Sequence, residues 1–337
     1  MAIINNTQYV DRTDAINRIP FKPNLISALG LFAEDTVNSD TVTFDERDNR
    51  LLVLDDHLRN TDKKNGIDPS EYKMHLLPIP HYPIENTITV KQLKGIRNFD
   101  TDVEQAIESA VAERLEKHTA DHDNHLEYLQ AKMVCAGELV TTNFGTLDMF
   151  DEFGVTKKTQ AIDFADTTSL EPQFRALTNE IKKSFKGGRA RGYVMLCGAD
   201  FFSAFVDHAD IRDGYVVAGQ NSPLRNELGE VANGYATFQY GNITLVQYDD
   251  LFTKQDGSTD QPLADGEAVL LPRGVLGTVF FGPVSKLSGV GASGAKRFAS
   301  SYRDPKDRYV EMESEQNTLV VLQEIAAAYY LSIAPAA

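Results

Sequence analysis

The periodicity of hydrophobic and polar positions changes several times along the chain, and the strongest helical pattern precedes its midpoint. Between Thr101 and Val134, apolar residues recur three or four positions apart, and neither Gly nor Pro interrupts them. Thr101 and Glu104 have the spacing of a capping box, and Gly137 follows the last apolar position. The pattern predicts a spine helix over residues 101–134, about 50 Å long and longer than a small domain needs.

Alternation typical of strands lies upstream of this helix. It begins near Thr41, gives way to a polar, turn-rich tip at residues 59–66, and returns near Thr87. Three prolines between positions 78 and 83 exclude a helix there. We therefore expect a two-stranded excursion over residues 45–95, and it should lean on a neighbour because isolated hairpins are marginally stable in water.

The first forty or so residues show no single period. Residues 23–34 are long enough for one short helix, with Asn24 as its cap. The segment is typical of an arm that packs on another surface, and a frayed terminus is the alternative.

The remainder alternates short strands with two further helical patterns, which predicts an α+β fold with mixed sheets. Apolar residues at helical spacing follow Ser169, and Gly241-Asn242 form the turn of a hairpin. We expect strands at 138–142 and 160–164 (paired as a hairpin), 193–196, 237–240, 243–248, 268–271, 278–281, 309–313, 318–322 and 326–333, and helices at 170–186 and 200–206.

Composition narrows the class of protein. The 337 residues are 42% hydrophobic, enough for a folded core, and the formal net charge of −16 argues against general coating of nucleic acid. No stretch of about 18 apolar residues and no signal peptide is visible, so we expect no membrane contact. Two cysteines form no disulfide scaffold, which indicates a reducing compartment such as a cytoplasm.

Three histidines in the predicted spine helix are the first candidate chemical site. His118 and His122 share one helix face, as two zinc ligands would, and His125 follows. No Glu follows His118, so the general base of a zinc protease is missing. We expect packing or interfacial hydrogen bonds from these side chains and no bound metal.

Catalytic and cofactor motifs are not evident elsewhere. Residues 289–294 spell G-x-G-x-x-G, but no βαβ unit surrounds them, and the sequence contains no G-x-S-x-G elbow. Cys135 ends the spine helix at its negative pole, where a thiol is not activated, and Cys197 lies in an apolar strand. We therefore predict no catalytic residue and no cofactor.

The densest basic run lies after the second helix. It holds Lys182, Lys183, Lys186, Arg189 and Arg191 within ten residues. Three interpretations stay open: contact with phosphates, pairing with acidic groups across a subunit interface, or a solvated helix end.

The order of parts is more informative than any motif. An arm with Ile19-Pro-Phe-Lys-Pro-Asn is followed by a long excursion, a spine helix and a compact α+β region. A strand-turn-strand runs from Tyr235 to Tyr248, Ala268-Val-Leu-Leu-Pro precedes Gly277, and residues 307–321 form an alternating return. This order resembles the major capsid proteins of tailed bacteriophages, the lambda-type phage capsid protein E family with the Hong Kong 97-like fold.

The resemblance implies four structural parts. They are an N-terminal arm (1–45), an E-loop over the adjacent subunit (46–95), a peripheral domain with the spine helix (96–189 and 301–317), and an axial domain (190–300 and 318–337).

The implied function is structural and not enzymatic. Copies would assemble as hexamers and pentamers of an icosahedral shell around double-stranded DNA, which the acidic chain would contact only weakly, and a procapsid would expand on maturation. The resemblance implies assembly in the host cytoplasm, a place in the virion, and as partners a separate scaffold protein, a portal and a cement or decoration protein. Inter-subunit contacts are expected from Phe21, Leu25, Leu51, Val53, Lys63, Lys64, Tyr72, Met74, Tyr82, His118, His122, Lys182, Lys183, Arg189 and Arg191.

The alternative is a soluble α+β enzyme or ligand-binding protein in which residues 45–95 form a lid. It predicts small oligomers and a defined pocket, whereas a capsid protein predicts very large particles.

Overall fold

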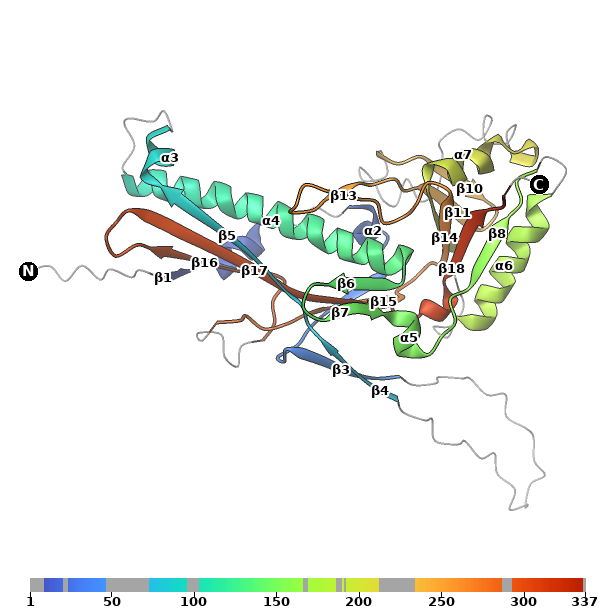
Figure 1. Ribbon diagram of the computed structural model, residues 1–337, viewed down its shortest axis with the longest axis horizontal. Helices are drawn as coiled ribbons and strands as arrows, with labels where there is room; N and C mark the ends of the chain where they lie inside the picture. The colour runs from blue at the N-terminus through green and yellow to red at the C-terminus, as the bar shows by residue number, and fades with distance from the viewer. Residues whose placement is uncertain are drawn as a thin grey trace, which may run out of the picture.

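One long helix, α4 (Val103–Cys135), runs along much of an elongated molecule (Figure 1). The computed structural model describes residues 9–20, 24–46, 73–95, 103–165, 169–185, 190, 192–211, 234–286 and 293–335. The predicted spine helix is confirmed, and the proposed cap at Thr101 lies outside the described residues. Gly137 follows the helix with a φ of 78°, a left-handed conformation that favours glycine, so the predicted stop is also confirmed.

The first sheet packs along α4 and is built around one long strand, β17. The predicted strands 309–313 and 318–322 are one continuous strand, because the polar residues between them are buried with hydrogen-bond partners such as His122 for Ser314. The members are β17 (Tyr309–Val321), β5 (His81–Thr89), β16 (Phe298–Arg303), β15 (Gly277–Phe281), β1 (Tyr9–Asp11, paired with β16) and β2 (Phe32–Thr36, parallel to β15).

The second sheet lies at the other end of the molecule, with two helices on one face (Figure 1). The predicted helices here and the hairpin about Gly241-Asn242 are confirmed. Its strands in spatial order are β10 (Thr237–Tyr240), β11 (Ile243–Gln247), β9 (Tyr193–Cys197), β14 (Glu267–Pro272), β18 (Tyr329–Ile333) and β8 (Thr159–Ile162), and its helices are α6 (Leu170–Ser184) and α7 (Ala199–Asp207).

The predicted hairpin between residues 138–142 and 160–164 is wrong. Strand β6 (Glu138–Thr141) pairs instead with β7 (Gly145–Asp148), and β8 pairs in parallel with β18. A three-residue turn closes the nearer hairpin at a lower entropic cost than the longer loop would. The chain then reaches the second sheet through α5 (Met149–Phe153), whose first turn is capped by Asp148.

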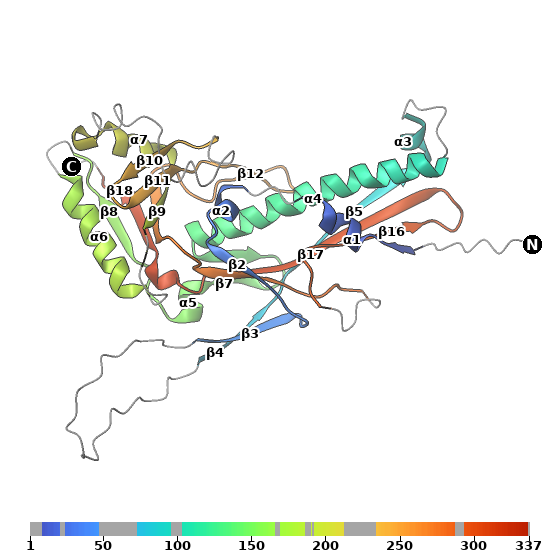
Figure 2. The same ribbon diagram turned by 180° about the vertical axis from the view of Figure 1, so that it is seen from behind.

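A separate hairpin projects from the body of the molecule (Figure 2). It consists of β3 (Thr41–Glu46) and β4 (Lys73–Pro78), and the chain between them lies outside the described residues. The two-stranded excursion predicted for residues 45–95 is therefore wrong in part, since β5 leaves it and pairs along β17. Burial of Ile88 in the core beneath α4 draws β5 back, and Pro83 is tolerated because no described strand pairs with the outer edge of β5.

The described part of the N-terminal arm packs on its own chain. Ile16 in α1 (Thr13–Arg18), and Leu25 and Ile26 in α2 (Leu25–Ala28), are fully buried. Over residues 9–20 and 24–36 a frayed terminus is therefore excluded. The smaller remaining elements are α3 (Val90–Gly95), β12 (Phe252–Thr253), β13 (Thr259–Asp260) and the 3₁₀ helix η3 (Ile325–Ala327).

The largest hydrophobic core joins the two sheets. Leu126 and Met133 of α4 share it with Val321 of β17 and Val269 of β14. The C-terminal half of the spine helix thus fixes one sheet against the other. Among the described helices, none is long and apolar enough to span a membrane.

Candidate functional site

The buried face of α4 carries polar side chains that form a seam with the first sheet and the arm. An apolar stripe would pack without hydrogen bonds, whereas each buried polar group needs a hydrogen-bond partner. The buried polar residues of this seam on α4 are His118, Thr119, His122, Asp123, Glu127 and Gln130.

His118 and His122 share one hydroxyl of β17. Ser314 Oγ lies 2.9 Å from His118 Nδ1 and 2.9 Å from His122 Nε2, and Asn86 Nδ2 lies 3.1 Å from His118 Nε2. One proton arrangement satisfies all three contacts: Asn86 donates to His118, His118 to Ser314, and Ser314 to His122. This arrangement requires two neutral imidazoles.

Burial keeps these histidines neutral. Desolvation, with a further contribution from Arg297, lowers the pKa of His122 to about 3, and desolvation lowers the pKa of His125 to about 4. The pKa of His118 is lowered as well, again chiefly by burial. Over the described residues no group of three or more His, Cys, Asp or Glu side chains is placed to hold a metal ion. The hydrogen bonds give His118 and His122 a structural role.

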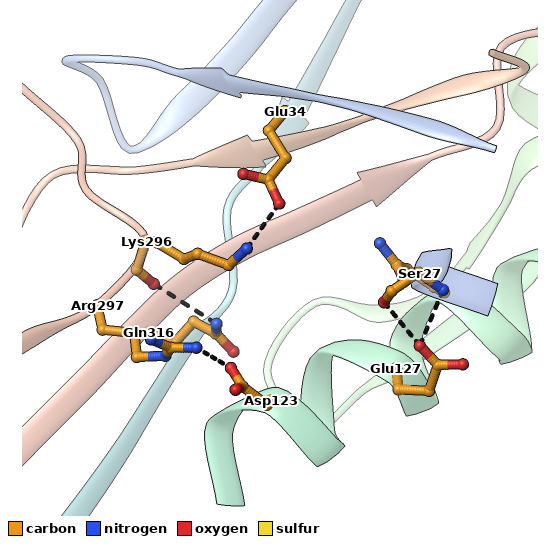
Figure 3. A network of polar contacts seen from close by, with 8 residues as sticks. Ser27, Glu34, Asp123, Glu127, Lys296, Arg297 and Gln316 are labelled. Carbon is orange, nitrogen blue, oxygen red and sulfur yellow. Dashed lines mark hydrogen bonds and ion pairs between the residues drawn. The ribbon is translucent and has the colours of Figure 1, made fainter. Parts of the chain in front are cut away.

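An ion pair is buried beside them. Arg297 contacts Asp123, and their side chains are only 2% and 8% exposed (Figure 3). Lys296, the preceding residue, pairs with Glu34 of β2 at 2.6 Å. The two residues that immediately precede β16 therefore contact the spine helix and β2.

Glu127 of α4 caps a helix that is distant in sequence. Its two carboxylate oxygens accept hydrogen bonds from Ile26 N at 2.6 Å and, as Figure 3 shows, from Ser27 N at 3.0 Å and Ser27 Oγ at 2.7 Å. Asn24, which we predicted as the cap of this helix, makes no side-chain cap hydrogen bond. Burial raises the pKa of Glu127, while the three hydrogen bonds oppose the rise. The arm is thus fastened to the spine by a group that local sequence patterns do not reveal.

The projecting hairpin has one buried and one open face. Met74 and Leu76 of β4 are 69% and 61% exposed, whereas His75 and Leu77 between and after them are buried. His75 Nδ1 lies 2.7 Å from Glu152 Oε1 of α5, which anchors the base of the hairpin. The outward apolar side chains are therefore held in place without being covered by the described part of their own chain.

The predicted inter-subunit residues fall into three groups. Met74, Lys182 and Lys183 are exposed, and Tyr82 is half-buried with its ring 4.2 Å from that of His125. The side chains of Leu25, His118 and His122 are buried in their own chain, where they contact its other residues. The remaining ones lie outside the described residues: Phe21, Leu51, Val53, Lys63, Lys64, Tyr72, Arg189 and Arg191.

Both cysteines are buried free thiols. Burial raises the pKa of Cys135 to about 12 and that of Cys197 well above its usual range. Residues 289–292 of the G-x-G-x-x-G motif lie outside the described residues. Gly294 is packed so tightly that a Cβ would lie 2.1 Å from the carbonyl oxygen of Phe281. Close backbone packing accounts for this glycine.

Comparison with known proteins gives a consistent result. The family model of phage major capsid protein E matches residues 10–331. The major capsid protein of Pseudomonas phage KPP10 is 26% identical over 334 residues, covering 94% of each chain, and that of Salmonella phage Felix O1 is 25% identical over 340 residues, covering 92% of this chain and 91% of the relative.

Solved structures support the same fold. A protein assigned as the capsid protein of an E. coli CFT073 prophage superposes with a TM-score of 0.62 at 14% identity, covering 97% of this chain and 99% of the other. The mature capsid of bacteriophage PhiM1 gives 0.52 at 7% identity, covering 94% and 89%. At these identities the structural likeness concerns the fold alone.

Proposed function

We propose, because this chain belongs to the phage major capsid protein E family, that its copies join in hexamers and pentamers of an icosahedral shell enclosing double-stranded DNA. The predicted Hong Kong 97-like α+β fold is confirmed, and so is the predicted role as a capsid protein of the virion. The alternative of an enzyme or ligand-binding protein with a lid has no support. We propose that the chain has no catalytic role.

The β3–β4 hairpin carries the proposal. It projects from the body, its base is anchored by His75 and Glu152, and it presents Met74 and Leu76 outward. Apolar side chains held in the open are typical of an interaction surface. A subunit that lies over its neighbour in a shell needs a rigid, outward-facing hairpin of this kind.

The finer organisation follows from the same proposal. The four parts would be the arm (1–45), the E-loop (46–95), the peripheral domain (96–189 and 301–317) and the axial domain (190–300 and 318–337). A procapsid would form with a separate scaffold protein and a portal in the host cytoplasm. It would then expand as DNA enters, and a decoration protein would bind the outer surface. The net charge of −16 fits weak contact with DNA, since like charges repel.

Electron microscopy and sedimentation of the purified full-length chain, produced with its scaffold, test the proposal. We expect large closed particles from the wild type. The variant Met74→Asp/Leu76→Asp should remain as small oligomers with an unchanged melting temperature, because both side chains are exposed in the isolated chain. Thr87→Asp, an exposed change on β5, is the matched control and should assemble. Only small oligomers from the wild type, or normal particles from the hairpin variant, would contradict the proposal.

A further inference from the structure

The helices that cover the second sheet carry opposite charges at opposite ends. At one end Glu171 of α6 and Asp207 of α7 are exposed, and Asp210, 46% exposed, accepts a hydrogen bond from Leu170 N at 3.4 Å. That hydrogen bond holds the end of α7 against the start of α6. We call Glu171, Asp207 and Asp210 the acidic pole. Arg175 lies 3.5 Å from Glu171, so the pole keeps a negative excess.

The opposite end of α6 is basic. Lys182 and Lys183 are exposed in its last turn, and Lys158 bonds to Ser184 Oγ and, at 2.7 Å, to the carbonyl oxygen of Ala326. We call Lys158, Lys182 and Lys183 the basic pole. Glu180 pairs with Lys183 at 2.5 Å, which leaves a positive excess. The 15 residues of α6 separate the two poles by about 20 Å.

The two poles face opposite sides of the molecule. In Figure 1, α7 lies at the upper edge of the second sheet. The C-terminal end of α6 lies at the lower edge, beside η3 and on the side where the β3–β4 hairpin projects. If a neighbouring copy lies on the side where the hairpin projects, the upper edge of the neighbour's second sheet would therefore face the basic pole of the first copy.

The described part of the chain does not account for the charge of Asp207. Lysines at the end of α6 suit the helix dipole, but Asp207 is the last residue of α7, where a negative charge is unfavourable. Among the described residues no cation forms an ion pair with Asp207, and no carboxylate forms one with Lys182. A cation in another copy would remove the cost of the charge on Asp207, and a carboxylate there would give Lys182 a partner.

We infer that the basic pole of one copy packs against the acidic pole of the next around a ring. This inference rests on the proposed shell-forming function and adds the contact that sets the order of subunits within a ring. A ring needs head-to-tail contacts between two different, complementary surfaces, and the two poles supply such a pair. Each copy carries a net charge of −16, so copies repel one another overall. Opposite charges at the two poles would favour the one orientation in which the poles meet.

Charge reversal and charge exchange test the contact. Lys182→Glu/Lys183→Glu should lower the yield of particles by about tenfold, and Asp207→Lys/Asp210→Lys should do the same. The chain with all four substitutions restores the pairing in the opposite sense and should recover most of the yield. Particle yield is measured by sedimentation of the full-length chain, and melting temperature reports on folding.

The control Lys91→Glu/Lys117→Glu changes net charge by the same amount as the lysine variant, at exposed positions of α3 and α4 that belong to neither pole. It should assemble normally. Equal loss in this control, unchanged yield in the reversed variants, or failure of the four-substitution chain to recover would each overturn the pole contact while particles of the wild type still form. Absence of wild-type particles would instead overturn the shell-forming function, and the pole contact with it.

Discussion

Substitution of Asp123 by Ala removes the only carboxylate that pairs with Arg297 among the described residues. The Arg297 side chain is 2% exposed, so water cannot replace the lost partner. Breaking a buried ion pair from one side costs about 3–5 kcal/mol, because the remaining charge stays buried. We therefore expect Asp123→Ala to lower the free energy of unfolding by about 3–5 kcal/mol, and Arg297→Met to have a similar effect.

Removing both charges together should cost much less. In Asp123→Leu/Arg297→Met no charge is left buried, and Arg297 Nε already lacks a hydrogen-bond partner among the described residues. Replacement of a buried ion pair by apolar residues is often neutral. The loss in the double variant should fall short of the sum of the single losses by about 2 kcal/mol or more.

Urea denaturation of the unassembled chain, followed by circular dichroism at pH 7, measures these differences. Arg175→Met is the matched control, since its partner Glu171 is 66% exposed and the loss should stay below about 1 kcal/mol. A loss below about 1 kcal/mol for Asp123→Ala, or strict additivity in the double variant, would refute the role assigned to the buried pair.

Three further predictions concern other buried groups. The pKa values of His122 and His125 in the folded chain, about 3 and 4, lie below the ordinary 6.5. Stability should therefore fall as pH drops from about 6.5 towards 4, by about 3 kcal/mol for His125 alone. Denaturation measured across this pH range checks the prediction, and His125→Phe should make stability depend less on pH. Gly198→Ala should lower stability by about 2 kcal/mol or more because its Cβ would lie 2.2 Å from the carbonyl oxygen of Ala264, whereas Gly266→Ala, with no atom nearer than 3.9 Å, should change it little in the same assay. The two buried cysteines should resist maleimide labelling until the chain unfolds, and rapid labelling of the native chain would contradict their burial.

Patterns local in sequence predicted the elements that local physics controls. The spine helix follows from uninterrupted apolar spacing and a terminal glycine, and the Gly241-Asn242 turn follows from residues that tolerate its conformation. The pairing of strands was harder to predict from the sequence. The partners of β5 and β8 lie more than 160 residues away, and alternation alone does not identify which strand pairs with which.

The fold class, the long helix, the acidity of the chain and the order of parts that resembles phage capsid proteins could all be inferred from the sequence. The folded structure was needed to show which polar residues make buried contacts within the chain and which are exposed. Glu127 and Ile26 are 101 positions apart in the sequence, and Asp123 and Arg297 are 174 positions apart. The periodicity of the sequence does not predict contacts between residues so far apart. Burial likewise assigned His118 and His122 to the seam and left Met74, Lys182 and Asp207 exposed, because exposure depends on what the rest of the chain covers.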